Sequence, residues 1–143
     1  MTLLLKKKGY IKIKMEIMKS RHICCQLILN KKKGFFLIDT GASNSCVDET
    51  KINFFSLIKN DSEIEVSGAG IEKIKVTPTK KSIFSFKDNK SIKLSLMLLE
   101  MESINISLKE QNNKAIDGIL GADFFKKSNA IIDYKSKNFY LKL

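Results

Sequence analysis

The chain has 143 residues, 43% of them hydrophobic, a size and composition that suit one globular domain spanning residues 1–143. Its 26 Lys and Arg against 15 Asp and Glu give a formal charge of +11. The apolar stretch at residues 1–5 is followed at once by Lys6, Lys7 and Lys8, so the sequence predicts neither a signal peptide nor a membrane span.

The N-terminal segment is strongly basic. Residues 1–33 contain ten Lys or Arg against one acid, Glu16, for a net charge of +9. Such a segment can attract nucleic acid, a membrane surface or an acidic partner. Only one basic residue of the chain, Arg21, is an arginine, so bidentate phosphate contacts are scarce and no specific nucleic-acid binding is expected. Apolar residues alternate with charged ones over residues 11–17, and we interpret residues 1–24 as a basic strand extension.

Two apolar runs, residues 25–29 and 35–38, flank Lys31–Gly34, a pattern that predicts a hairpin. The second run is typical of a strand buried on both faces, and it ends abruptly at Asp39. A carboxylate at a buried strand end needs a partner or a shared proton. The pattern therefore favours a catalytic aspartate over an ordinary turn.

The residues after Asp39 fit this interpretation. Gly41 allows a sharp turn and brings its amide close to the carboxylate. Thr40 and Ser43 supply short hydroxyls that can hydrogen-bond the carboxylate or brace the loop. The loop is therefore the candidate site.

The rest of the chain is predicted to be nearly all β. A helix is expected at residues 123–128, with a weaker helical pattern at residues 49–59. The remaining strands are expected to pair as hairpins, 63–67 with 71–79, 82–86 with 91–99, and 131–134 with 139–143.

Three further aspartates are weighed against Asp39. Asp117 precedes Gly118 and is favoured as a turn residue before an apolar strand. Asp123 is favoured as the opening residue of the short helix. Asp133 is favoured as a strand or hairpin residue facing solvent or a basic neighbour. None of the three is expected to be catalytic.

Several stretches resemble a known family. Leu37–Ser43 resembles the active-site loop of the retropepsin-like aspartic proteases, the group that contains the retroviral proteases and small bacterial homologues. Ile116–Phe125 is similar to the family's late block, in which an apolar strand and a glycine lead into a short helix beneath that loop. Ala130–Tyr134 resembles the strand that follows in the bacterial members. Val66–Ile71 falls where the family places its flap, a glycine-bearing hairpin over the substrate.

The resemblance spans residues 25–143 and implies an all-β fold, a closed retropepsin-like β-barrel or acid-protease half-fold with one or two short helices. It implies an aspartic endopeptidase that acts on polypeptide substrates without a cofactor. In it, Thr40 would brace two loops across a dimer axis and Ser43 would hydrogen-bond the carboxylate. The implied site comprises catalytic Asp39, the loop residues Thr40, Gly41, Ala42 and Ser43, and the flap residues Gly68, Ala69 and Gly70.

One chain supplies only half of such a site. Aspartic proteolysis uses two carboxylates about one water molecule apart, one as base and one as acid. The chain is too short for a second lobe, and Asp-Thr-Gly occurs once, with no Asp-Ser-Gly. We therefore expect a C2 homodimer in which two Asp39 side chains share one proton.

The thiols and the histidine indicate little further chemistry. Cys24, Cys25 and Cys46 are an odd number without metal-ligand spacing, so we expect reduced thiols, a cytoplasmic protein and no metal. Cys46 is either a reactive thiol or, as we favour, a small core residue. His22 has no orienting acid nearby in the sequence, which disfavours a Ser-His or Cys-His mechanism.

Other interpretations stay open. The domain could be a catalytically inactive retropepsin-like module that binds extended peptides, or a monomer that has lost dimerisation. The basic N-terminal segment could instead be the active part and tether the domain to an anionic surface.

Overall fold

The structure is a computed structural model that describes residues 1–61, 64–67 and 73–143, with side chains at all of these except 64–67 and 73–75. Its main sheet follows the order β6-β7-β10-β5-β11-β4-β3-β8-β9, and β2 pairs with β3. The bounds of these strands are β2 Glu16–Ile17, β3 Ile23–Leu29, β4 Lys32–Ile38, β5 Cys46–Asp48, β6 Ile64–Ser67, β7 Lys73–Pro78, β8 Ser82–Ser85, β9 Ser91–Leu94, β10 Met97–Leu99 and β11 Gly118–Leu120.

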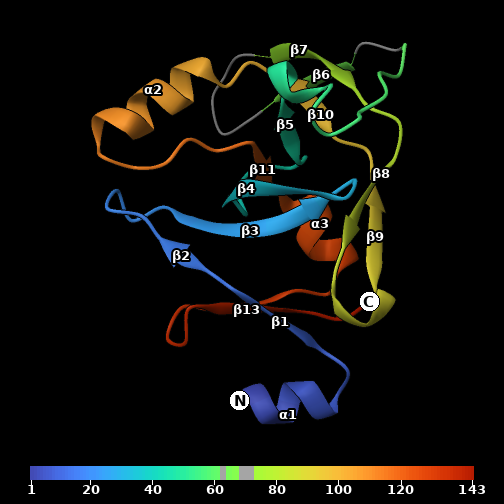
Figure 1. Ribbon diagram of the computed structural model, residues 1–143, viewed down its shortest axis with the longest axis vertical. Helices are drawn as coiled ribbons and strands as arrows, with labels where there is room; N and C mark the ends of the chain where they lie inside the picture. The colour runs from blue at the N-terminus through green and yellow to red at the C-terminus, as the bar shows by residue number, and fades with distance from the viewer. Residues whose placement is uncertain (62–63, 68–72) are drawn as a thin grey trace.

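A smaller sheet has the order β1-β13-β12. Its strands are β1 Ile11–Lys14, β13 Asn138–Leu141 and β12 Ile131–Asp133, and the helices are α1 Thr2–Lys7, α2 Glu102–Glu110 and α3 Ala122–Lys127. Two 3₁₀ turns, η1 Glu49–Lys51 and η2 Lys87–Asn89, complete the described elements. Figure 1 shows α1 at one end of the molecule and α2 with β5–β7 and β10 at the other.

Strand β11 lies between the two strands that flank the Asp39 loop. It runs parallel to β4, with Ile119 opposite Leu37, and antiparallel to β5. Gly118 permits the close approach, because a Cβ there would clash with the carbonyl oxygen of Cys46. The loop from β4 to β5 therefore passes over the end of β11.

Strand β4 has apolar neighbours on both faces, as its sequence predicted. Phe36 is fully buried in the main core, and Ile38 packs against the same cluster. Phe35 and Leu37 pack against a second cluster that includes Leu108 of α2. Hydrophobic side chains thus cover both faces of the strand that leads to Asp39.

A row of edge-to-face phenylalanines connects this strand to the short helix below the loop. Phe36 contacts Phe84 at a ring-centroid distance of 5.6 Å, and Phe84 contacts Phe124 of α3 at 5.4 Å. Phe125 continues the row to Phe139 of β13 at 6.1 Å. Because these rings are mostly buried, the row fixes α3 under the sheet.

Most expected strands and the helix at residues 123–128 are present, with shifted ends. The hairpin turn is tighter than predicted, because Asn30 and Lys31 both adopt positive φ and β4 begins at Lys32. The Asn30 side chain stabilises this turn by donating to the Phe55 carbonyl at 2.9 Å and accepting from the Ile83 amide at 2.8 Å.

Three segments differ from the sequence prediction. Residues 49–59 contain only the 3₁₀ turn η1 followed by turns, with Ser56 at a φ of 52°, so no α-helix forms there. The strand predicted at 91–99 is split, since β9 pairs with β8 whereas β10 pairs with β5 and β7. The N-terminal extension begins with the helix α1 before its strands.

The sheet is curled but open, because its order within the described residues ends at β6 and at β9. The predicted mainly β fold with short helices is confirmed, although the sheet forms a half-barrel that is not fully closed. The described residues contain three α-helices, including α2 at residues 102–110, for which the sequence analysis predicted no element. Within α2, Ile104 and Leu108 lie four residues apart and face the second cluster. This apolar stripe is short, and the serine and asparagine residues beside it are poor helix formers, so the sequence pattern does not indicate a helix.

Candidate active site

Asp39 follows directly on β4, and one amide of its own loop hydrogen-bonds its carboxylate. The Asp39 amide donates to the Leu120 carbonyl at 3.0 Å, which continues the pairing of β4 with β11. The Gly41 amide donates to Oδ1 of Asp39 at 3.0 Å. A Cβ at Gly41 would lie 3.3 Å from that same oxygen, so glycine gives the main chain its close approach to the carboxylate.

The loop lies at the surface of the single chain. Asp39, Thr40 and Gly41 are exposed, although the sequence predicted a buried carboxylate. The strand is packed on both faces as far as Ile38, and the loop returns to the second cluster at Ala42, so only the turn between these two residues lies outside the clusters. Among the described residues, the Thr40 hydroxyl has no hydrogen-bond partner.

Ser43 differs from its expected role. Its hydroxyl is paired with the Asn44 side-chain amide at 3.3 Å, and the hydrogen bond expected between Ser43 and Asp39 is not formed among the described residues. The main chain of Ser43 instead contributes to positioning, because its carbonyl accepts from the Asp123 amide at 3.3 Å. Ala42 does the same through its carbonyl, which accepts from the Ala122 amide at 2.7 Å.

A buried hydroxyl connects this loop to α3. The Ser45 hydroxyl donates to Oδ1 of Asp123 at 2.6 Å and accepts from the Gly121 amide at 2.9 Å, while the Ser45 amide donates to Oδ2 at 3.0 Å. Ser45 is fully buried, so these bonds form away from water. Sequence reasoning missed Ser45, since a lone serine beyond the Asp-Thr-Gly pattern has no recognisable signature.

Gly121 is required by the same contact. A Cβ at this position would lie 2.7 Å from the Ala42 carbonyl oxygen and 2.9 Å from that of Asn44. No L-residue larger than glycine fits without moving the loop backbone. Gly121, the glycine before the short helix, therefore allows the carbonyls of Ala42 and Asn44 to pack directly against the start of α3.

The other aspartates have structural partners, in agreement with the sequence prediction. Asp117 accepts from the Phe35 amide at 2.8 Å and lies 3.7 Å from the Lys51 ammonium. Asp123 lies in the first turn of α3, one residue after the helix begins at Ala122, and accepts from the Phe124 amide as well as from Ser45. In the last hairpin, the Ser136 hydroxyl donates to Asp133 at 2.6 Å and lowers the pKa of that carboxyl.

The three cysteines are free thiols. Burial, followed by the charges of Asp123 and Asp39, raises the pKa of the Cys46 thiol to about 11. Burial likewise raises the pKa of Cys24 to about 12 and that of Cys25 well above its ordinary value. These thiols stay protonated near neutral pH, which favours the core interpretation of Cys46 over the reactive one.

The structure describes only part of the segment predicted to form the flap. Strands β6 and β7 pair antiparallel, with Ser67 opposite Lys73. The flap residues themselves, Gly68, Ala69 and Gly70, lie outside the described residues.

His22 lies in an exposed turn, where its Nδ1 is 2.8 Å from the Ser20 hydroxyl.

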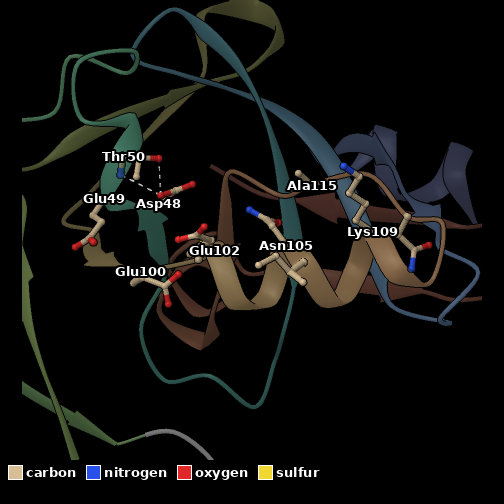
Figure 2. Close-up of a pocket in the computed structure, with 11 residues that line it drawn as sticks. Asp48, Glu49, Thr50, Glu100, Glu102, Asn105, Lys109 and Ala115 are labelled. Atoms are coloured by element: carbon tan, nitrogen blue, oxygen red, sulfur yellow. Dashed lines mark hydrogen bonds between the residues drawn. The ribbon is translucent and has the colours of Figure 1, made fainter.

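A cavity of about 750 Å³ lies between the end of β5 and α2, and Figure 2 shows its lining. Asp48 accepts both the amide and the hydroxyl of Thr50 at 3.0 and 2.8 Å on one oxygen. Three more carboxylates line it, those of Glu49, Glu100 and Glu102, and none of its lining residues belongs to the Asp39–Ser43 loop.

The described residues lack two further kinds of feature, a metal-binding cluster and a membrane-spanning helix. Residues 1–61, 64–67 and 73–143 contain no group of three or more His, Cys, Asp or Glu side chains arranged to hold a metal ion. In the same part of the chain, every helix is too short or too polar to cross a bilayer.

No family model and no curated protein sequence matches the chain, but solved structures do. A retropepsin-like aspartic protease from Rickettsia conorii matches 93% of this chain and 89% of its own, with a TM-score of 0.58 and 16% identity. The retroviral protease-like domain of Ddi1 from Leishmania major matches 82% and 86%, with a TM-score of 0.56 and 15% identity. EIAV protease in an inhibitor complex matches 73% and 85%, with a TM-score of 0.47 and 17% identity. The similarities to the Rickettsia conorii and Leishmania major structures show that the chain has a retropepsin-like fold, which confirms the resemblance seen in the sequence.

Replacing Ser45 should destabilise the protein measurably. Ser45→Ala removes a buried hydroxyl that serves both Asp123 and Gly121, and we expect a loss of about 1–3 kcal/mol in the free energy of unfolding. Urea denaturation measures this loss. Ser43→Ala is the matched control, because Ser43 is exposed, and it should change stability by less than about 0.5 kcal/mol. Equal stabilities of the two variants would contradict the role of Ser45.

Thiol labelling tests the environment of Cys46. With a pKa of about 11, roughly one thiol in a thousand is ionised at pH 8, so alkylation should be at least about tenfold slower in the native protein than in urea. Iodoacetamide labelling followed by peptide mass spectrometry reports each cysteine separately. Native labelling of Cys46 as fast as in urea would show a reactive thiol.

Proposed function

We propose that this protein is an aspartic endopeptidase, in which a water molecule activated by the Asp39 carboxylates of two chains attacks a peptide bond. One observation carries the proposal: Asp39 ends a strand of a retropepsin-like fold, in a loop that Ser45 and Gly121 fix on β11 and α3. The naming of the Rickettsia conorii structure as an aspartic protease supports the proposal.

The exposure of the loop supports the dimer. In the single chain, Asp39, Thr40 and Gly41 face solvent, so a second copy has room to place its own loop against them. Asp117 and Asp123, the other aspartates weighed as candidates, are already engaged by backbone amides, Lys51 and Ser45. The second carboxylate of the reaction is therefore the Asp39 of another copy, brought to a C2 axis by an isologous interface.

The chemistry follows from two like charges at short distance. Two ionised Asp39 groups repel each other, so the pair retains one proton over the working pH range. The unprotonated Asp39 takes a proton from the water as it attacks the carbonyl carbon, and the protonated one donates to the carbonyl oxygen. The first Asp39 then passes its new proton to the amide nitrogen as the C–N bond breaks, and the second regains a proton from a hydroxyl of the adduct, so the pair again holds one proton. No covalent intermediate and no cofactor is required.

The loop and flap would hold the substrate as an extended strand. Under the resemblance, Thr40 braces the two loops across the axis, Gly41 accepts a hydrogen bond from the substrate backbone, and Gly68, Ala69 and Gly70 cover it. We further propose a cytoplasmic location, since all three cysteines are free thiols.

The alternative function is peptide binding without hydrolysis. The similarity to the Ddi1 domain is compatible with this alternative, because the shared property is the fold. A chain whose exposed Asp39 never meets that of a second copy would bind an extended peptide but not cleave it.

Asp39→Asn should abolish hydrolysis of an unstructured protein at mildly acidic pH and leave the fold intact. The amide can neither accept the proton of the water nor share one, so we expect turnover to fall by about 10²-fold or more. Asp88→Asn is the control, because it makes the same change in an exposed hairpin turn whose positive φ asparagine tolerates. Wild-type hydrolysis by the Asp39 variant would rule out the catalytic assignment.

Mixing wild-type protein with Asp39→Asn protein tests whether the site is shared. With random pairing, activity should fall as the square of the wild-type fraction, because only a dimer of two intact chains has both carboxylates. Subunit exchange is verified independently with labelled chains. If activity per wild-type chain stays constant while exchange occurs, the composite site does not exist.

A further inference from the structure

Helix α1 presents an apolar outer face to solvent. Leu3 and Leu4 are 69% and 58% exposed, whereas Leu5 is 7% exposed. Opposite the apolar face, the Thr2 hydroxyl is hydrogen-bonded to the Tyr140 hydroxyl of β13 at 2.7 Å. Successive helical residues are about 100° apart, so Thr2 and Leu5 share the inner side while Leu3, Leu4 and Lys7 share the outer side. The contact with β13 therefore fixes both leucines facing outward.

Lysines follow this apolar face in the chain. Lys6, Lys7 and Lys8 follow the leucines directly, and the exposed Lys12 and Lys14 alternate with half-buried isoleucines on β1. Among the described carboxylates, none forms an ion pair with these five lysines. We name Leu3, Leu4, Lys6, Lys7 and Lys8 together the α1 face.

A cavity of about 430 Å³ adjoins the α1 face. Four lysines line it together with a single carboxylate, that of Asp88, and the rings of Tyr10 and Tyr140. The lysines are Lys6, Lys12, Lys87 and Lys90. This excess of ammonium groups in a concave site suits a phosphate-sized anion.

We propose that the α1 face docks on the surface of an anionic phospholipid bilayer. The two leucines enter the boundary between head groups and acyl chains, the lysines contact lipid phosphates, and the cavity accommodates one head group. Figure 1 places α1 and α2 at opposite ends of the molecule, so docking through α1 leaves the α2 end free in solution.

The combination of groups favours a bilayer over other partners. A second copy docked through the same face would oppose two sets of three lysines, and such like-charge contacts are unfavourable. Nucleic acid would engage the lysines but leave both leucines in water. An anionic bilayer satisfies both chemistries at once, because it offers an apolar layer directly beneath its phosphates.

Vesicle co-sedimentation of the full chain tests the proposal without any measurement of proteolysis. We expect binding to phosphatidylcholine vesicles that contain phosphatidylglycerol, and none to phosphatidylcholine alone. The triple variant Lys6→Gln, Lys7→Gln, Lys8→Gln should bind at least about tenfold more weakly. Its control, Lys31→Gln, Lys32→Gln, Lys33→Gln, removes the same charge from the distant β3–β4 hairpin and should stay within about twofold of wild type.

The double variant Leu3→Ser, Leu4→Ser separates the apolar contribution from charge. Both side chains are exposed, so the fold should persist, as circular dichroism checks, and binding should drop about fivefold or more. Equal losses in the two lysine variants would overturn the proposal in favour of unspecific attraction by net charge. Unchanged binding by the leucine variant with competition by inorganic phosphate would indicate a soluble anion site instead. Self-association that the leucine variant abolishes would identify a second copy as the occupant.

Discussion

The candidate site depends on one buried hydroxyl group. The Ser45 hydroxyl donates to Asp123 and accepts from the Gly121 amide, and it is completely shielded from water. The buried Ser45 hydroxyl would be unfavourable without a partner, and the half-buried Asp123 carboxylate supplies one, so Ser45 and Asp123 stabilise each other. Since Ser45 ends the loop that Asp39 begins, this contact determines where the Asp39 carboxylate lies relative to α3.

The remaining structure maintains that contact. Strand β11 lies between β4 and β5 and leads directly into α3, so the loop and the helix approach each other from adjacent strands. The phenylalanine row from Phe36 through Phe84 to Phe124 keeps α3 beneath the sheet. At Gly121, the absence of a side chain allows the loop carbonyls to reach the helix.

The exposure of Asp39 has a simple physical meaning. Asp39 lies outside both hydrophobic clusters, and the only hydrogen bond to its carboxylate from the described residues comes from Gly41. A reaction that needs two carboxylates must obtain the second from outside this arrangement. Helix α1, which carries the basic α1 face, contacts the smaller sheet of β1 and β13, whereas the Asp39 loop belongs to the main sheet. Surface docking and pairing at the loop therefore use different parts of the chain.

The sequence by itself determined the local features of this protein. The apolar run before Asp39, the following Thr40 and Gly41, and the hairpin turns all follow from residues that are neighbours in the chain. The tertiary structure decided the rest. Ser45 and Asp123 are 78 residues apart, and their pairing leaves no trace in either local pattern. Whether a carboxylate is buried also depends on what packs over it, and only the folded chain shows that nothing in its described part covers Asp39.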